Sequence, residues 1–357
     1  MGIPRLLPAV RSISRPRHIM DYKGSVVGID GHVWLHRSVF MDAETLANGF
    51  DTTSHVKYFI RRIQKLVASG VRPLVVFDGA DLPAKCTTHK NRSSSRTISM
   101  GRAVALRESG STSESYNLFA KAADLKFHLV RDIMTALQQE GIEAVMAPYE
   151  ADAQLAHLSK LGMVDLVMTE DSDLLAYGCT RTLFKWDPVS MFGLEVLGSL
   201  SDAAPFRGLS QLDALSACIL AGSDYGPGIR GIGISRAIDL VRKCSRGDGH
   251  ETAFEEMMEI GRLGKFAIPD MNECLENLRI AKFVFRHQTI FSNTDCRLLP
   301  LNPYKENLEI SKYSGYLGRI YDAADAHDVY KGRLHPVTHS EYQEIKKPQL
   351  GNIVLNS

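Results

Sequence analysis

The chain has 357 residues, of which 44% are hydrophobic and 23% are charged, and its formal net charge is +1. This balance is that of a globular protein, and it excludes a globally basic nucleic-acid binder, so any contact with a polyanion must come from local patches. No apolar run is long enough to span a membrane, and the six cysteines form no C-x-x-C pair. We therefore expect a reduced intracellular protein with neither a zinc knuckle nor a membrane partner.

The first third of the chain alternates apolar strands with a helix. GSVVGID predicts a strand ending at Asp30, and PLVVFDG predicts a second strand followed by Asp78. Between them, residues 53–69 have the spacing of a helix whose buried face includes Val67. Before them, residues 2–22 carry four arginines, which indicate either a phosphate contact or a solvated surface: Arg5, Arg11, Arg15 and Arg17.

Residues 81–127 interrupt this alternation. The segment is weakly periodic and Ser-rich, and its charges are mostly basic: Lys85, Lys90, Arg92, Arg96, Arg102 and Arg107. An insertion of this length is usually either a functional lid or a flexible segment, and both readings remain open. A basic lid beside an acidic crevice would complement a phosphodiester held between them.

The stretch that follows carries two acidic groups. APYEADAQLAHL predicts a helix with Glu150 and Asp152 in its first turn and a buried face that extends to Leu161. VDLVM then predicts a buried parallel strand, and its exit, TEDSD, contains Asp171 and Asp173. Further on, RTLFKWD predicts a strand ending at Asp187.

Strand ends that carry aspartates predict both the fold and the place of the site. The pattern favours an α/β fold with a mostly parallel twisted sheet flanked by helices. The carboxyl ends of such strands form one edge of the sheet, so Asp30, Asp78 and Asp171 should converge there.

A glycine-rich hairpin follows a helix that begins after Ser210. GSDYGPGIRGIG places Asp224 in a tight turn and then exposes backbone that can approach a phosphate, beside Arg230 and Arg236. Residues 252–332 read as helices, including 252–263, for which no chemistry is expected.

Seven carboxylates in one crevice would require cations, because buried like charges raise each other's pKa. The absence of His and Cys from this set favours Mg²⁺ or Mn²⁺, and two such ions can hydrolyse a phosphodiester. D-x-D motifs also occur in haloacid dehalogenase phosphatases and glycosyltransferases, but those chemistries do not explain the other five acids. The predicted set is Asp30, Asp78, Glu150, Asp152, Asp171, Asp173 and Asp224.

The sequence resembles the structure-specific 5′ nuclease family of flap endonuclease, XPG and exonuclease 1, and is most similar to the exonuclease 1 type. MGIPRLL and VVGIDGHVWLHR match the N-terminal block, APYEADAQLAHL and TEDSDLLAYG match the internal block, and GSDYGPGIRGIG matches the helix-two-turn-helix block. The resemblance covers nearly the whole chain. It implies a PIN-like 5′ nuclease core with a helical arch and a helix-two-turn-helix.

The resemblance also implies roles for individual residues. The seven acids would bind two Mg²⁺, for which Mn²⁺ can substitute, and Lys85 and Arg92 would contact the scissile phosphate. Gly2, freed by removal of Met1, would lie near the site, and His36 would steer the substrate. Further substrate contacts would come from Arg96, Arg230, Gly231, Gly233 and Arg236, and a K⁺ site from Ser223, Ile229 and Gly231.

Three features depart from the family's pattern. His32 stands where the exonuclease 1 type has tyrosine, and RSSSR at 92–96 is less basic than the family's arch. The family's long tail with mismatch-repair partner sites is missing. We therefore expect either a catalytic fragment or a naturally short protein.

The resemblance divides the chain into a nuclease core in two parts (1–80 and 131–208), an arch (81–130), a helix-two-turn-helix segment (209–250), a helical appendage (251–335) and a tail (336–357). It implies a monomeric nuclear enzyme that degrades duplex DNA from 5′ ends and nicks and cuts 5′ flaps during repair. Two alternatives stay open: a flap endonuclease of replication and repair, and a catalytically silent DNA-junction binder.

Overall fold

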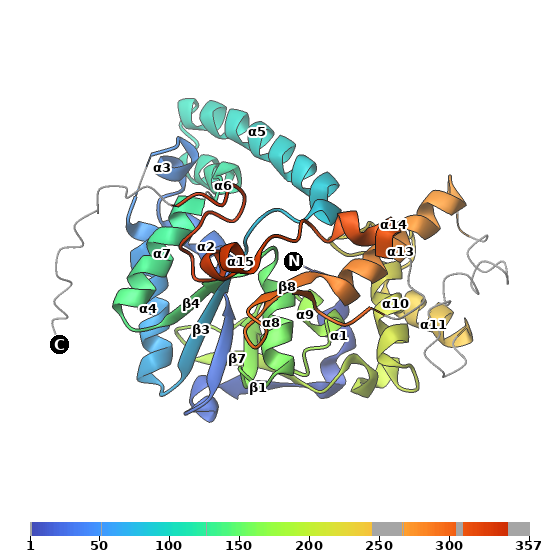
Figure 1. The fold of residues 1–357 in the computed structure, drawn as a ribbon. Coiled ribbons are helices and arrows are strands. Elements are labelled where there is room, and N and C mark those ends of the chain that lie inside the picture. Colours follow the sequence, from blue (N-terminus) through green and yellow to red (C-terminus); the bar gives the residue numbers. More distant parts are fainter. Residues whose placement is uncertain are drawn as a thin grey trace.

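A seven-stranded sheet forms the centre of the molecule (Figure 1). The computed structural model describes residues 2–50, 52–125, 127–244, 266, 268–304 and 310–341. The spatial order of the strands is β1-β7-β6-β5-β2-β3-β4, with β6, β5, β2, β3 and β4 parallel and with β7 and β1 antiparallel to their neighbours. The strands are β1 (Ser14–His18), β2 (Val26–Asp30), β3 (Arg72–Phe77), β4 (Glu143–Met146), β5 (Leu166–Thr169), β6 (Arg181–Phe184) and β7 (Phe192–Leu197). The predicted fold class is confirmed, but the antiparallel edge of β1 and β7 was not predicted.

Helices cover both faces of this sheet because successive strand residues point to opposite sides. On β3, Val75 and Phe77 pack with one group of helices, and Leu74 and Val76 pack with the other. The first group is α2 (Gly31–Ser38), α4 (Ser54–Ala68) and α7 (Phe127–Gln139). The second group is α1 (Leu6–Ala9), α8 (Ala151–Lys160), α9 (Asp173–Ala176) and α10 (Gln211–Ala221).

Three local predictions were wrong at the ends of elements. Val67 and Leu161 are each 46% exposed. Val67 lies in the last turn of α4, where Leu66 takes the buried side of the helix, and Leu161 is the C-cap of α8, after its last helical residue. Asp187 does not end a strand, since β6 stops at Phe184. Its carboxylate instead accepts hydrogen bonds from the backbone of Val189 and Ser190 in the turn before β7.

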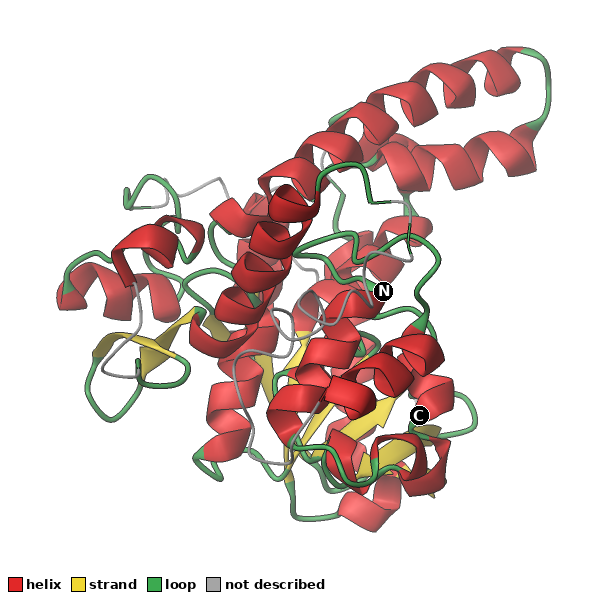
Figure 2. Cartoon of the chain, turned by 90° about the vertical axis from the view of Figure 1, so that its right-hand side faces the viewer, coloured by secondary structure: helices red, strands yellow, loops and turns green. Residues whose placement is uncertain are grey.

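The basic insertion folds as a helical hairpin that projects from the sheet (Figures 1 and 2). It consists of α5 (Cys86–Glu108) and α6 (Thr112–Ala122), and it rests on α3 (Ala43–Ala47). Buried Ala103 and Phe119 pack against Ala43, and Arg107 lies 3.3 Å from the carboxylate of Glu44. The insertion is therefore a packed helical structure rather than a structureless linker.

The C-terminal part returns to the core. It comprises α11 (Ile234–Cys244), α13 (Met271–His287), the hairpin of β8 (Thr289–Ser292) and β9 (Arg297–Pro300), α14 (Ile310–Tyr313) and α15 (Ala323–Tyr330). The expectation of helices alone missed the hairpin, and the helix expected over 252–263 and the end of the tail, 342–357, lie outside the described residues. Short 3₁₀ helices are η1 (Arg11–Ile13), η2 (Ile19–Tyr22), η3 (Val39–Met41), η4 (Pro83–Lys85), η5 (Leu200–Asp202), η6 (Ala204–Phe206) and η8 (Ser314–Tyr316). None of the described helices is long and apolar enough to cross a membrane.

The antiparallel edge is held by a buried carboxylate. The fully buried Glu195 on β7 accepts hydrogen bonds from Nε of Arg15 (2.9 Å), Arg17 (3.2 Å) and Arg181 (3.1 Å). Burial opposes ionisation of this group, but the hydrogen bonds, above all those from Arg15 and Arg181, outweigh it and lower its pKa. Of the four N-terminal arginines, Arg15 and Arg17 therefore stabilise the edge of the sheet through Glu195.

Replacing Glu195 by glutamine should lower the free energy of unfolding by about 2 kcal/mol, because three guanidinium groups lose their charged acceptor. Urea denaturation at pH 7 measures this, with Glu140→Gln on the surface as the control. Equal stability of the two variants would show that the cluster contributes nothing to the edge.

Candidate active site

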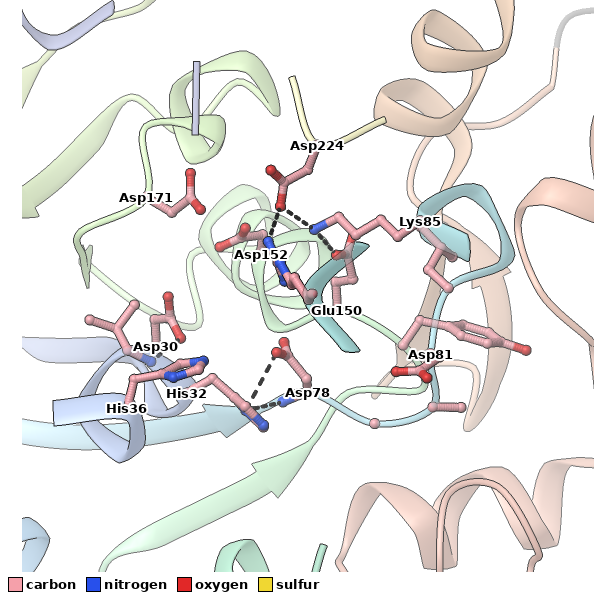
Figure 3. A pocket seen from close by; sticks show the side chains of 16 residues that line it. Asp30, His32, His36, Asp78, Asp81, Lys85, Glu150, Asp152, Asp171 and Asp224 are labelled. Atoms are coloured by element: carbon pink, nitrogen blue, oxygen red, sulfur yellow. Dashed lines mark hydrogen bonds and ion pairs between the residues drawn. The ribbon is translucent and has the colours of Figure 1, made fainter. Parts of the chain in front are cut away.

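The aspartates at the strand ends converge as predicted. Asp30 ends β2, Asp78 directly follows β3 and Asp171 follows β5 after one intervening residue. Because β5, β2 and β3 are adjacent and parallel, these side chains reach one edge of the sheet. Figure 3 shows their carboxylates facing a common space.

The beginning of α8 completes this edge. Glu150 is the N-cap of α8 and Asp152 lies in its first turn, while Asp78 accepts a 2.7 Å hydrogen bond from the backbone N–H of Ala151. The helix dipole thus favours three carboxylates at the same place. Asp224, from the turn after α10, joins them at the pocket (Figure 3).

Six of the seven predicted acids line this pocket, and Asp173 lies behind them. The backbone N–H of Asp173 donates to Asp171 (3.0 Å), and its carboxylate accepts from the N–H of Ile3 (3.0 Å). The start of the chain therefore lies against the site, as predicted for Gly2. A Cβ at Gly2, whose φ is +82°, would stand 2.2 Å from Oδ1 of Asp171, so that only glycine fits.

Burial raises the pKa of most of these acids. Desolvation and then the charge of Asp78 raise the pKa of Asp30 to about 7. Burial, followed by the charge of a neighbouring aspartate, also raises the pKa of Asp152 and Asp173 well above the usual range. The pKa of Asp171 is raised mainly by burial. The cluster therefore resists holding its full negative charge without cations.

Basic residues at the start of the hairpin neutralise part of this charge. Lys85 pairs with Glu150 and lies 3.1 Å from Asp224, and Arg92 also lies 3.1 Å from Asp224. Burial lowers the pKa of Lys85, but the two carboxylates outweigh it and raise the pKa overall. Burial alone would raise the pKa of Asp224, yet Lys85 and Arg92 lower it.

The donor set fits hard divalent cations. Its side chains offer only oxygen, and the buried Oδ1 of Asp152 accepts no hydrogen bond. In the described part of the chain, no three Asp, Glu, His or Cys side chains are grouped closely enough to hold an ion as they stand. The ammonium of Lys85 supplies positive charge between Glu150 and Asp224 instead.

Two histidines also line the pocket. Nδ1 of His32 accepts a 2.9 Å hydrogen bond from the N–H of Asp78, which orients the ring beside that carboxylate. Burial, assisted by His32, lowers the pKa of His36 to about 4, so this ring is neutral at pH 7. His32 stands where the exonuclease 1 type has tyrosine, and its ring is held by the backbone N–H of Asp78.

Other predicted residues lie outside the lining of the pocket. Arg96 pairs with Asp124 at 3.3 Å, and Arg236 donates to the carbonyl oxygen of Gly231 at 3.2 Å. Arg230, Gly231 and Gly233 are exposed on the glycine hairpin, and Arg236 is exposed in the first turn of α11, while Ser223 and Ile229 belong to the turn around Asp224.

Sequence reasoning missed several contributors, among them Asp81 in the lining of the pocket and Tyr225, whose hydroxyl donates to Oε2 of Glu150. Gln288, from the segment for which no chemistry was expected, donates from Nε2 to Oε2 of Glu150 at 3.0 Å. Nothing in its local sequence distinguishes it from a polar residue between a helix and a strand. Gln288 lies 138 positions from Glu150 in the sequence, so its local sequence could not reveal this contact.

Comparison with known proteins places the chain in context. Residues 1–98 match the XPG N-terminal domain and residues 141–224 match the XPG I-region. Exonuclease 1 of Xenopus laevis is 33% identical over 327 residues, covering 88% of this chain and 43% of the relative. Exodeoxyribonuclease 1 of Schizosaccharomyces pombe is 32% identical over 342 residues, covering 95% of this chain and 58% of the relative. The chain thus spans about half the length of these relatives.

Solved structures support the same fold. The catalytic core of Rad2 in complex with DNA substrate superposes with a TM-score of 0.58 at 19% identity, covering 92% of this chain and 89% of that one. The Holliday junction-resolving enzyme GEN1, in complex with product DNA and a Mg²⁺ ion, has a TM-score of 0.53 at 18% identity, covering 82% of this chain and 66% of that one.

The raised pKa of Asp30 predicts how pH affects the metal-free protein. Between its unfolded value near 4 and its folded value of about 7, the folded state retains a proton that the unfolded chain has released. In chelator, the free energy of unfolding should therefore fall by roughly 2 to 4 kcal/mol as the pH rises from about 4 to about 7.

Urea denaturation across this pH range tests the prediction. Asp30→Asn should make the dependence less steep, whereas Asp239→Asn on the surface of α11 should leave it unchanged. A wild-type profile already flat over this range would contradict the prediction.

Proposed function

The chain belongs to the XPG family of structure-specific 5′ nucleases, and on this premise we propose that it hydrolyses DNA phosphodiesters with two divalent cations. The activity would be 5′ to 3′ exonucleolytic on duplex DNA and endonucleolytic at 5′ flaps. The observation that carries the proposal is the pocket in which six of the predicted carboxylates, together with Asp81, meet Lys85 and Arg92 at the base of the helical hairpin.

The ligands of the cations would be the seven acids of the site. Carboxylate oxygens would come to the pocket from Asp30, Asp78, Asp152, Asp171 and Asp224, and Glu150 would offer Oε1. Asp173 is outside the lining of the pocket, and its backbone N–H donates a hydrogen bond to Asp171. When bound, the two cations would activate a water molecule and stabilise the leaving oxygen of the phosphodiester. The presence of Mg²⁺ and product DNA in the GEN1 structure supports this choice of ion.

The hairpin would hold the substrate against these acids. Thr88 donates to the carbonyl oxygen of Asp224 at 3.1 Å, so α5 begins at the edge of the pocket. Lys85 and Arg92 therefore present positive charge where a phosphate would enter. The hairpin above would clamp or thread a displaced 5′ strand, with the terminal nucleotides unpaired before cleavage.

Similarity to exonuclease 1 favours duplex ends as the preferred substrate. A flap endonuclease would cut flaps well and recessed duplex ends poorly, and a silent junction binder would cut neither. The remaining proposals are exchange of Mg²⁺ for Mn²⁺, K⁺ at Ser223, Ile229 and Gly231, a monomeric state, a nuclear location and mismatch-repair partners.

Cleavage of a labelled duplex with a recessed 5′ end, and of a 5′ flap, tests the function. Asp171→Asn should reduce the Mg²⁺-dependent rate by about 10³-fold while DNA binding persists, because a carboxylate ligand is lost. Asp187→Asn, in a turn away from the pocket, is the control. Flap cutting alone would indicate a flap endonuclease, and binding without cleavage in Mg²⁺ or Mn²⁺ would reject the enzyme.

Removing either basic residue should weaken catalysis more than binding. We expect Lys85→Met and Arg92→Ala each to lower kcat by about 10² to 10³-fold, because each removes charge that would face the phosphate in the transition state. Single-turnover rates and DNA affinity separate the two effects. Arg102→Ala, exposed further along α5, should have a rate near that of the wild type. An equal loss of rate in all three variants would contradict the prediction, because it would indicate only a general attraction between the basic helix α5 and DNA.

A further inference from the structure

A buried polar network lies behind Glu150. Oε2 of Glu150 accepts hydrogen bonds from the hydroxyl of Tyr225 and from Nε2 of Gln288, the latter at 3.0 Å. The hydroxyl of Tyr177 donates to Oε1 of Gln288 and also contacts the hydroxyl of Tyr225. Tyr177, Tyr225 and Gln288 are 4%, 6% and 0% exposed, so water does not compete for these groups.

The network fixes which oxygen of Glu150 faces the pocket. Oε2 already has two protein donors, whereas Oε1 is directed to Lys85. A carboxylate can only accept, so Gln288 must turn its NH₂ group toward Glu150 and its carbonyl oxygen toward Tyr177. Rotation of Glu150 away from this orientation would leave buried donors unpaired.

Two backbone attachments hold Gln288 at this distance. The carbonyl oxygen of Gln288 accepts a 2.9 Å hydrogen bond from the N–H of Leu301 in the hairpin of β8 and β9. The amide of Gln154 exchanges hydrogen bonds of 2.9 and 2.8 Å with the backbone of Phe291. Since α8 carries both Gln154 and Glu150, β8 is fastened to the helix whose N-cap it orients.

Aromatic packing limits the movement of the two tyrosines. The ring of Phe285 lies 4.7 Å from that of Tyr225, edge to face, and 5.0 Å from that of Tyr177. The ammonium of Lys85 lies 5.1 Å from the centroid of the Tyr225 ring. Tyr225 therefore contacts Glu150 itself and the two other residues that interact with Glu150, which are Lys85 and Gln288. This makes Tyr225 the centre of the network.

We propose that Tyr225 and Gln288, supported by Tyr177, are positioning residues that hold Glu150 ready for a divalent cation and so set the affinity of the site for it. This inference rests on the proposed function. Partners that orient a metal ligand reduce the reorganisation needed on binding, and their loss commonly weakens metal affinity. The C-terminal segment would thus act on the site although none of its described residues lines the pocket.

Mg²⁺ titration of Tyr225→Phe and Gln288→Met tests the proposal. Both changes keep the size of the side chain and remove a donor to Glu150. The Mg²⁺ concentration for half-maximal cleavage of a recessed duplex should rise about tenfold in each, with a smaller fall in kcat at saturating Mg²⁺. Tyr177→Phe should shift it in the same direction but less, since Tyr177 acts through Gln288 and Tyr225.

A second readout does not depend on cleavage. Mg²⁺ should raise the Tm of the wild type, and the two variants should need about tenfold more Mg²⁺ for the same increase. Tyr330→Phe is the matched control, because Tyr330 is buried in the same segment and stacks on Phe291 at 4.5 Å. Its Mg²⁺ dependence should equal that of the wild type.

Wild-type Mg²⁺ dependence in both Tyr225→Phe and Gln288→Met would overturn the proposal, as would an equal shift in Tyr330→Phe. If the wild type does not cleave DNA but Mg²⁺ still raises its Tm, the proposed function fails and the Tm series alone decides on positioning. If Mg²⁺ neither supports cleavage nor changes the Tm of the wild type, both proposals are overturned.

Discussion

Negative charge buried at one edge of a parallel sheet is the constraint on which the rest of this structure depends. Burial raises the pKa of Asp30, Asp152, Asp171 and Asp173, so the ionised cluster needs positive charge close by. The chain supplies part of it through Lys85 and Arg92. The proposed cations would supply the rest of the positive charge. Without them, keeping these carboxylates buried side by side would lower the stability of the protein.

Segments far apart in sequence close around this charge. The chain start reaches Asp173 through Ile3, and Thr88 of the hairpin is bound to the turn of Asp224. On the other side, Gln288 contacts Glu150 from the C-terminal part. Each contact ends on a site residue, so the pocket is shaped by the whole fold rather than by one motif. The proposed entry of substrate under the hairpin and the geometry of the carboxylates would therefore be linked through the same few residues.

Sequence patterns predicted the central part of the fold and failed at its margins. The strands of the parallel core are continuous apolar runs, which a local reading detects. β1 reads SRPRH and has no apolar pattern, because it lies at the edge and places Arg15 and Arg17 on Glu195. β8 is only four residues long and begins one residue after α13, so no strand was recognised in a segment that reads as helices.

The sequence by itself determined that acidic residues gather at one sheet edge. An aspartate at the end of an apolar strand is a local pattern, and parallel strands bring such ends together wherever they lie in the chain. Only the tertiary structure decided that Lys85 lies between Glu150 and Asp224, and that Glu150 turns Oε1 to Lys85. The physical reason is that Gln288 and Glu150, 138 positions apart, meet only because β8 docks on α8, and no pattern within either segment encodes that contact.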